Sequence, residues 1–504
     1  MCQQKWTPSA RIVLSAMVFW GQIQNYMMRK NLSILIVAMV KDEQILEVNK
    51  TEEIGELTCI ENRIMKDEAV IGNGYSTTSN KGFEWDAFTR GQILGAFSIG
   101  YLTTQVRIYL SQLLNKLCTY FFIIFQIIGG RMAENYGYKR VYGYGLFCTG
   151  LLCFASPMVA KINAWAFMLL RVFQGIFEGV TYPALFAMTA RWIPLKERNL
   201  FIARSFSGSV FGLIITYPMC GMLIVSHGWE SAFYVIGAIT TVWFIFWQFL
   251  VFDKPDQHPR IAQEELDYIQ NELHDTLNEK PKPIPWKSIL MSVPFWGMVI
   301  SDCGSCWGMI TLGSNGPTYL KYMLGVDIKT NGLLSGLPYL VRYIGGLLHG
   351  AIADYFVSHG ILSVLSVRRI FNSICMCGPA ISMFILAFPP YGTECNVALT
   401  IAIICIGFFF NGGMAAGHFS SPVDLTPNYA GSLFGITNTI SGGVLGFGVP
   451  VLIGMISTDM TFSSWTIIFG LASIIYVVTN VFYFFMISGE IQKWNFTVTV
   501  SHWV

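Results

Sequence analysis

The chain has 504 residues, of which 53% are hydrophobic and only 12% are charged. Soluble domains carry about 25% charged residues, so this composition excludes an ordinary water-soluble protein and indicates the lipid bilayer as the main surrounding. The net charge of +2 provides no strongly basic surface, so we expect no nucleic-acid partner.

Long apolar segments recur along the whole chain, and several are close to the ~20 residues that a helix needs to cross ~30 Å of hydrocarbon. They predict an all-α membrane protein with about twelve transmembrane helices. The predicted spans are 12–40, 89–130, 141–160, 163–190, 203–226, 231–252, 290–316, 331–353, 370–389, 397–418, 430–456 and 463–487.

One long polar stretch, 253–287, separates the first six spans from the last six. Its apolar residues recur at roughly helical spacing, which predicts a surface helix within a cytosolic linker. The linker divides the chain into an N-terminal half, 1–252, and a C-terminal half, 288–504, which ends in a short cytosolic tail. The halves also echo each other, because Gly130-Arg-Met-Ala-Glu134 follows the second span and Gly350-Ala-Ile-Ala-Asp354 follows the eighth. Such a repeat is typical of two six-helix halves around a central pathway.

Basic residues predict the orientation, because cytosolic loops are enriched in Lys and Arg. They follow the second, fourth and eighth predicted spans, so we expect that side and both termini to be cytosolic. Segment 41–89 on the opposite side contains the sequon Asn49-Lys50-Thr51, which predicts an exoplasmic, glycosylated loop. Most cysteines lie in apolar segments and are expected to be packing residues, whereas Cys59 and Cys395 are the pair available for one external disulfide.

Polar side chains inside the first predicted span form one stripe. A central charge costs ~2.5–3.5 kcal/mol on insertion, so such residues need a function or a partner. Arg29 is the charged member, and its planar guanidinium fork suits carboxylate or phosphate. We expect this face to line a cavity, with Lys30 pointing away toward the membrane interface. The stripe consists of Gln22, Tyr26, Arg29 and Ser33.

The fourth predicted span has a second stripe, made of Arg171, Gln174, Glu178 and Tyr182. Arg171 and Glu178 are about 10.5 Å apart along the helix axis, so either Gln174 or a substrate must lie between them. The functional interpretation makes Arg29, Arg171, Tyr26 and Gln174 anion-binding residues and Glu178 the group that senses a coupling cation. The alternative is that these charges form structural pairs between helices, or that Arg29 extends to an interface.

A glycine-containing loop follows the second span, with the pattern G-x-x-x-E-x-x-G-x-K-R. Its glycines allow close helix approach, and its charges can hold helix ends in one conformation and release them in another. Ordinary cytosolic basic charge explains the last two residues but not the spacing of the others. The candidate gating residues are Gly130, Glu134, Gly137, Lys139 and Arg140.

No pattern of a P-loop, a nucleophile elbow, a catalytic triad or a metal cluster occurs, and His349 and His418 are isolated in the sequence. We therefore expect no metal site, no cofactor and no enzymatic activity. A membrane transferase would need a polar catalytic constellation that the loops do not offer. A sensor without transport activity is the remaining alternative class.

Several motifs together resemble the major facilitator superfamily and, within it, the anion:cation symporters, which include sodium–phosphate cotransporters, sialin and vesicular glutamate transporters. The resemblance covers nearly the whole chain and is nearest to the insect-type inorganic phosphate cotransporters. Some relatives have a histidine where this chain has Phe186. Glutamate transporters have an arginine and a histidine where this chain has about Ser305 and Leu94, which disfavours glutamate. The motifs are Tyr26-Met-Met-Arg29-Lys-Asn31-Leu-Ser-Ile, Gln174-Gly-Ile-Phe-Glu178-Gly-Val-Thr-Tyr-Pro183-Ala, Trp192-Ile-Pro-Leu-Lys-Glu197-Arg198, Asn331-Gly-Leu-Leu-Ser-Gly-Leu-Pro338-Tyr-Leu and Gly435-Ile-Thr-Asn438-Thr.

This resemblance implies the major facilitator fold and secondary active transport of a small anion, with Na⁺-coupled inorganic phosphate as the first expectation. The alternative is a transporter of organic anions such as sialic acid or urate, driven by H⁺ or the membrane potential, in a vesicular or lysosomal membrane. The coupling ion is thus Na⁺ or H⁺, and the membrane is the plasma membrane or an endolysosomal one. A monomer suffices for such a pathway, and the sequence does not define the oligomeric state.

Residues 106–126 interrupt the second span in a way that the resembling sequences do not. Without them, Gly91–Gln105 joins Ile127–Gly130 into a segment of about one span. With them, the segment is long enough to cross the membrane twice, and every later basic loop would then lie on the exoplasmic side, against the charge bias. We infer a retained intron, because Val106-Arg107 can be encoded by a donor-like GTAAGA and the segment ends in codons compatible with a pyrimidine-rich CAG acceptor.

Sequencing transcripts across this junction tests the inference. The expected dominant message lacks the 63 nucleotides that encode these 21 residues. A dominant message that retains them would contradict a retained intron.

Overall fold

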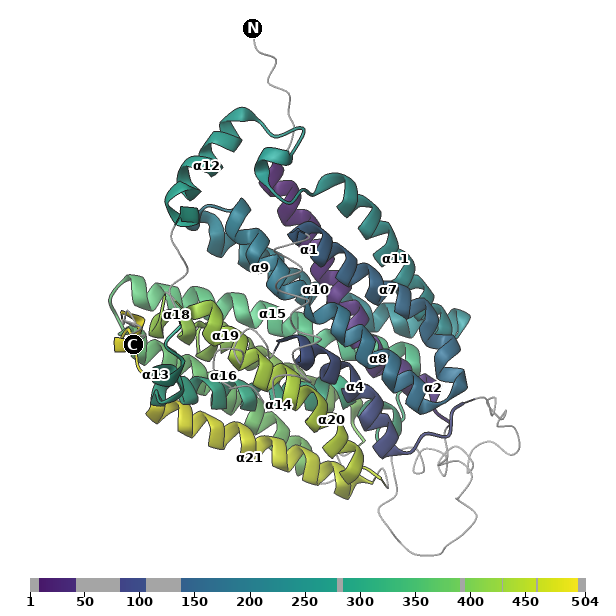
Figure 1. Cartoon of the computed structure of the whole chain (residues 1–504). Helices are drawn as coiled ribbons and strands as arrows, with labels where there is room; N and C mark the ends of the chain where they lie inside the picture. The colour runs from purple at the N-terminus through teal and green to yellow at the C-terminus, as the bar shows by residue number, and fades with distance from the viewer. Residues whose placement is uncertain are drawn as a thin grey trace, which may run out of the picture.

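The computed structural model describes residues 9–41, 82–105, 137–278, 284–389, 395–427, 429–458 and 461–496. In these ranges the protein is nearly all-helical, with two six-helix halves joined by a linker (Figure 1). Seven helices among the described residues are long and apolar enough on their own to cross a membrane. The other spans are interrupted or more polar, and together they confirm the predicted all-α fold with twelve transmembrane helices.

Two spans of the N-terminal half are broken near their middle. The first consists of α1 (Ala10–Lys30) and α2 (Leu32–Met39), which meet at Asn31, and the fourth of α8 (Ala164–Gly179) and α9 (Thr181–Trp192), which meet at Val180. The other spans of this half are α4 (Ala87–Gln105), α7 (Tyr138–Ile162), α10 (Leu195–His227) and α11 (Trp229–Leu250) (Figure 1).

In the C-terminal half the irregular spans are the tenth and the eleventh. In the tenth span the α-helix ends at Asn411 and two short 3₁₀ turns follow it. In the eleventh, a π-helical turn, η5 (Thr439–Val444), joins α19 (Ala430–Asn438) to α20 (Leu445–Ile456). The other helices are α13 (Trp286–Leu290), α14 (Val293–Tyr322), α15 (Ile328–Ser358), α16 (Val364–Ala387), α17 (Val397–Asn411), α18 (Ser421–Leu425) and α21 (Phe462–Met486).

The two halves pack tightly at one end of the bundle, where α2 ends and α4 begins; we call it the loop end. The Tyr217 hydroxyl donates to the Gly313 carbonyl oxygen at 2.6 Å, and its ring stacks on Tyr339 of α15 at 5.7 Å between centroids. A Cβ atom on Gly454 of α20 would lie only 2.5 Å from the Ala87 carbonyl oxygen. Glycine therefore allows the backbones of α20 and α4 to approach closely.

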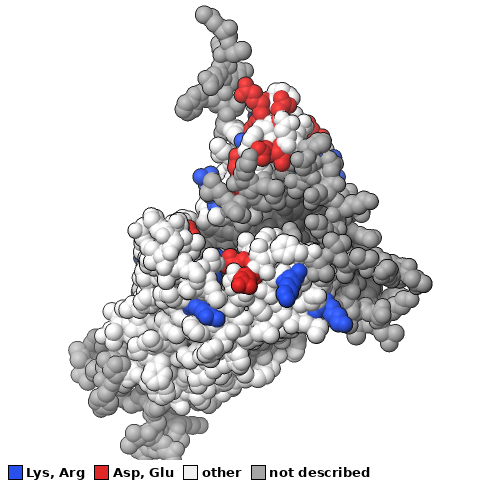
Figure 2. All heavy atoms as spheres, turned by 90° about the vertical axis from the view of Figure 1, so that its left-hand side faces the viewer, with Lys and Arg blue, Asp and Glu red and all other residues white. Residues whose placement is uncertain are grey.

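The halves diverge toward the opposite end, where α11 ends and the linker begins; we call it the linker end (Figure 1). Figure 2 views this end and shows the acidic side chains of the linker helix on its upper part. Among the described residues, the halves are in contact at the loop end and lie apart at the linker end.

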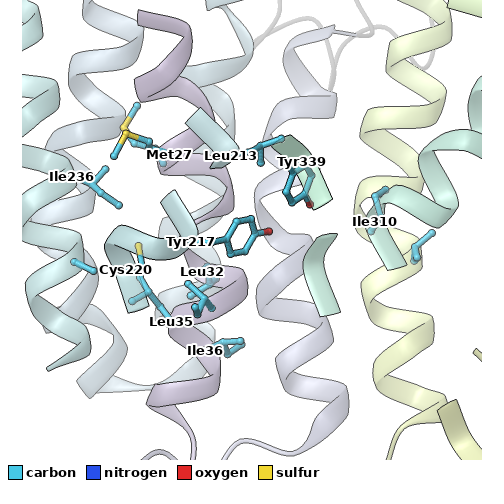
Figure 3. Close-up of a cluster of buried hydrophobic side chains, with 14 of the residues drawn as sticks. Met27, Leu32, Leu35, Ile36, Leu213, Tyr217, Cys220, Ile236, Ile310 and Tyr339 are labelled. Carbon is cyan, nitrogen blue, oxygen red and sulfur yellow. The ribbon is translucent and has the colours of Figure 1, made fainter. Parts of the chain in front are cut away.

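Apolar packing joins the broken first span to its neighbours (Figure 3). Met27, Leu32 and Leu35 are at most 2% exposed and belong to one cluster with Leu213 of α10 and Ile236 of α11. Fully burying such a side chain contributes about 1.5–3 kcal/mol. This cluster fixes the position of the break relative to the fifth and sixth spans.

The predicted linker helix is confirmed as α12 (Gln263–Asn278). It docks on the start of α1, where the Glu265 carboxylate accepts from the Ser9 hydroxyl, from the backbone N–H of Ala10 at 3.0 Å and from Arg11 Nε at 2.9 Å. Although burial acts in the opposite direction, these hydrogen bonds hold the pKa of Glu265 below its usual value.

Several expectations fall outside the described residues, namely the sequon at Asn49, the insert 106–126 and the loop residues Gly130 and Glu134. Cys395 is disulfide-bonded, whereas its expected partner Cys59 lies outside these ranges. The eight cysteines within apolar segments are free thiols, as predicted.

We predict that Glu265→Gln loosens α12 from α1 and speeds amide exchange of α12 about tenfold, because hydrogen bonds to a charged group contribute about 1.5–3 kcal/mol when buried and less at this partly exposed position. Lowering the pH should do the same to the wild type. Since the folded pKa is depressed, the contribution is complete above the ordinary value of 4.5 and is lost as the pH falls below it. Hydrogen exchange with mass spectrometry measures both effects. Glu264→Gln, at an exposed neighbour, is the control and should change nothing.

Candidate functional site

Arg171 ties the fourth span to the break in the first. Helix α8 begins at Asn163, whose side chain accepts from the Ala166 N–H at 2.7 Å, and two turns later it places Arg171 against the end of α1. The Arg171 guanidinium, 1% exposed, donates to the carbonyl oxygens of Met28 at 3.3 Å and Arg29 at 3.4 Å. The last carbonyls of a helix have no partner within the helix. Arg171 donates to two carbonyls in the last turn of α1.

Gln174, one of the two groups that the spacing allowed beside Arg171, hydrogen bonds with it. Its side-chain oxygen accepts from Arg171 Nη1 at 2.9 Å, and its amide nitrogen donates to the Ser156 hydroxyl of α7 at 3.3 Å. Gln174 is fully buried. It therefore orients the Arg171 guanidinium, and this buried network links the first, third and fourth spans.

Arg29 lies among aromatic rings at the surface where the two halves meet. Its guanidinium carbon is 4.7 Å from the Tyr101 ring centroid, 5.6 Å from Phe97 and 5.9 Å from Tyr26. A Cβ added to Gly442 of η5, in the opposite half, would lie 4.0 Å from Arg29 Nη2. Among the described residues, neither a carboxylate nor a carbonyl oxygen forms a hydrogen bond with this guanidinium. The aromatic faces attract the cation, and its N–H groups remain available to a ligand.

Glu178 is fully buried, and in the described part of the chain neither of its carboxylate oxygens has a hydrogen-bond donor. It stands two residues before Val180, where α8 and α9 meet, and its charge interacts with Arg29 and Arg171. Beside it, the Thr181 hydroxyl donates to the Glu178 carbonyl oxygen at 2.6 Å and accepts from the Asn25 amide at 3.4 Å. A buried carboxylate without donors is costly, so this position is suited to binding a cation.

The structure thus brings Arg29, Arg171 and Glu178 together, as expected. The expectation that the whole first-span stripe lines a cavity is wrong for Gln22, which is fully buried and hydrogen bonds with Tyr142 and Ser209 inside the N-terminal half. The reason is that α1 packs that part of its face against α7 and α10. The expectation is also wrong for Ser33, which is buried and hydrogen bonds with Tyr217.

Lys30 was expected to point toward the membrane interface, and this expectation is wrong. Its ammonium donates to the Ser314 hydroxyl of α14, in the other half, at 3.3 Å. Arg29 and Lys30, the last two residues of α1, both reach the interface between the halves, although they lie on different faces of the helix. Helical periodicity predicts the different faces but not that the C-terminal half packs against both.

His418 is also not isolated, contrary to the sequence prediction. Its Nε2 atom lies 3.5 Å from the Asp302 carboxylate of α14, an ion-pair distance, and its Nδ1 atom lies 2.8 Å from the Asn372 amide oxygen. The Asn372 oxygen also accepts from the Ser301 hydroxyl at 3.0 Å. The second histidine, His349, contacts only its own helix carbonyl and aromatic rings among the described residues.

Three of the candidate gating residues are described, and two of them contact Asp253 at the end of the sixth span. Gly137 has a φ of 93°, which favours glycine, and a Cβ there would meet the Asp253 carboxylate. The backbone N–H of Lys139 donates to Asp253 at 2.7 Å, while Arg140 is exposed. These contacts lie within one half, so the gating role stays a prediction.

Comparisons with known proteins agree with this architecture. The family model of the Major Facilitator Superfamily matches residues 18–449. Human sialin is 34% identical over 96% of this chain and 91% of its own length, and a Drosophila ananassae "Putative inorganic phosphate cotransporter" is 35% identical over 95% and 93%. The solved structure of the E. coli xylose transporter XylE, in an inward open conformation, superposes with a TM-score of 0.65 at 12% identity, covering 96% of this chain and 98% of that one.

We predict opposite effects on stability for the two arginines. Arg171→Met removes a buried hydrogen-bonded cation and should lower the free energy of unfolding by about 3–5 kcal/mol, because carbonyls and Gln174 lose their donor. Arg29→Met removes a cation with no hydrogen-bonding partner and should leave thermal stability unchanged or raised in ligand-free protein. Melting curves of the purified variants in detergent measure both. An equal loss of thermal stability in Arg171→Met and Arg29→Met would contradict the different roles of the two side chains.

Proposed function

Because the chain belongs to the major facilitator superfamily and, within it, to the anion:cation symporter family, we propose that this anion transporter carries inorganic phosphate together with Na⁺ by alternating access. The observation that supports an anionic substrate is the Arg29 guanidinium, which lies between the halves without a hydrogen-bonding partner among the described residues. Its planar fork matches two oxygens of a phosphate. The similar insect protein is named as a phosphate cotransporter, which favours this anion.

In this proposal Arg29 is the direct ligand, with Tyr26 beside it, and Arg171 is a positioning residue. Arg171 holds the carbonyls of Met28 and Arg29 and so fixes where the break presents the Arg29 side chain. Gln174 acts through Arg171 in the same way. A misplacement of about 1 Å at such a site is costly, which explains why a buried arginine is used to support a helix break.

Glu178 is the proposed coupling residue, because its carboxylate is buried and lacks donors. Na⁺ or H⁺ would neutralise it. The two arginines that interact with it would then be released from part of their attraction to Glu178 and would bind the anion more strongly.

The basic loops support a cytosolic position for the linker end and for both termini. The divergence of the halves at that end corresponds to an inward-facing state of the transport cycle, with the loop end closed. The plasma membrane and an endolysosomal membrane both fit this orientation. No cofactor is required, since ion gradients supply the driving force.

A second candidate function is H⁺-driven export of an organic anion, favoured by the 34% identity to human sialin. The same Arg29 and Glu178 would serve it, since a carboxylate also matches the guanidinium fork. The driving ion and the substrate distinguish the two candidates.

The test uses purified protein in proteoliposomes and labelled phosphate, with an imposed Na⁺ or H⁺ gradient. We expect Na⁺-driven uptake by the wild type and at least about a hundredfold loss in Arg29→Gln, because a bidentate charged contact contributes several kcal/mol. Glu178→Gln should abolish gradient-driven accumulation but retain phosphate exchange. Sialic acid uptake driven by H⁺, without phosphate uptake, would favour the second candidate and refute the first.

A further inference from the structure

Lys30 and Arg29 approach the interface between the halves from the same turn of the first span. Arg29 stays with aromatic rings of α1 and α4 and faces η5 near Gly442. Lys30 instead reaches α14, where its ammonium donates to Ser314 and where Cys306 also lies close to its charge. Two cationic groups thus flank the region where the C-terminal half meets the first span.

The charges of this region do not balance. Arg29, Lys30 and Arg171 are three cationic side chains that influence one another, whereas Glu178 is the one carboxylate that interacts with Arg29 and Arg171 among the described residues. No described carboxylate pairs with Lys30, and the Ser314 hydroxyl is neutral. Uncompensated charge inside a protein is costly, so a bound ligand with two negative charges would neutralise the site.

We propose that Lys30 is a second cationic ligand of the transported anion and that the site therefore selects doubly charged oxyanions over singly charged ones of the same shape. This rests on the proposed function of anion transport and specifies its substrate class. The Arg29 fork would bind two oxygens, and the compact Lys30 ammonium would act as a point charge on a third. A singly charged anion would leave one buried cation without compensation.

The contact between Lys30 and Ser314 also bears on alternating access, because it links the two halves. The Lys30–Ser314 contact joins the first span to the seventh, and the Tyr101 hydroxyl is joined to the eleventh span by the Asn438 amide at 3.0 Å. An anion held by Arg29 and Lys30 would therefore contact side chains of both halves at once. Such a ligand stabilises the conformations in which the halves enclose it.

Sulfate and perchlorate provide the matched probe, because both are tetrahedral oxyanions that do not titrate near neutral pH and they differ by one charge. Each is tested as an inhibitor of labelled phosphate uptake in proteoliposomes and as a stabiliser of the purified full-length protein against thermal unfolding. The wild type should bind sulfate at least about tenfold more tightly than perchlorate, which is the effect of about 1.4 kcal/mol from one additional charge contact.

Lys30→Gln should remove most of this preference by weakening sulfate alone, whereas Lys30→Arg keeps the charge and should keep the preference. Lys329→Gln removes the same charge from an exposed position at the loop end and should behave as the wild type. Equal affinity of the wild type for both anions, or an unchanged preference in folded Lys30→Gln, would overturn the proposal while phosphate transport still stood. Sulfate stabilisation that depends on Lys30, in protein that does not transport phosphate, would support the proposal and refute the proposed substrate.

Discussion

The hydrogen bonds of the buried Arg171 guanidinium to the carbonyls of Met28 and Arg29 are the constraint on which the central site depends. A helix that breaks within a membrane leaves carbonyl oxygens without partners, and lipid offers none. Arg171 satisfies them, and those carbonyls in turn give its own charge a polar environment. Gln174 completes this arrangement by accepting a further hydrogen bond. Arg171 thus holds the end of α1 against the fourth span.

The end of α1 presents two cations to the other half. Arg29 and Lys30 are its last two residues and point about 100° apart, so they reach different elements. Arg29 lies against the Tyr101 ring and faces η5, while Lys30 reaches Ser314 on α14. The second break, beside Glu178 in the fourth span, lies next to this region and places a carboxylate without donors close to the cations. Two interrupted helices thus create a polar site inside an apolar bundle.

Much of this arrangement could be predicted from residue type and spacing. Apolar length gave the spans, and the rarity of charges within them pointed to Arg29, Arg171 and Glu178. Spacing left Gln174 or a substrate as the group beside Arg171, and in the structure Gln174 hydrogen bonds there. What could not be predicted was which helices pack against each face of a span. Periodicity puts Arg29 and Lys30 on different faces of α1 but does not show that both meet the other half. It also could not show that His418, which follows the irregular end of the tenth span, meets Asp302 of the seventh.

The direction of coupling follows from the same charges. Glu178 and a bound anion compete for the attraction of Arg29 and Arg171, because both are negative and interact with the same guanidinium groups. A cation bound at Glu178 removes that competition and raises the affinity for the anion. By thermodynamic reciprocity the anion raises the affinity for the cation by the same factor, and coupling of this kind is typically about 1–3 kcal/mol, or about 5- to 150-fold. Positive cooperativity between a cation and an anion is what symport requires. In the mechanism that we propose, it arises without direct contact between the two ligands, because the two arginines are shared.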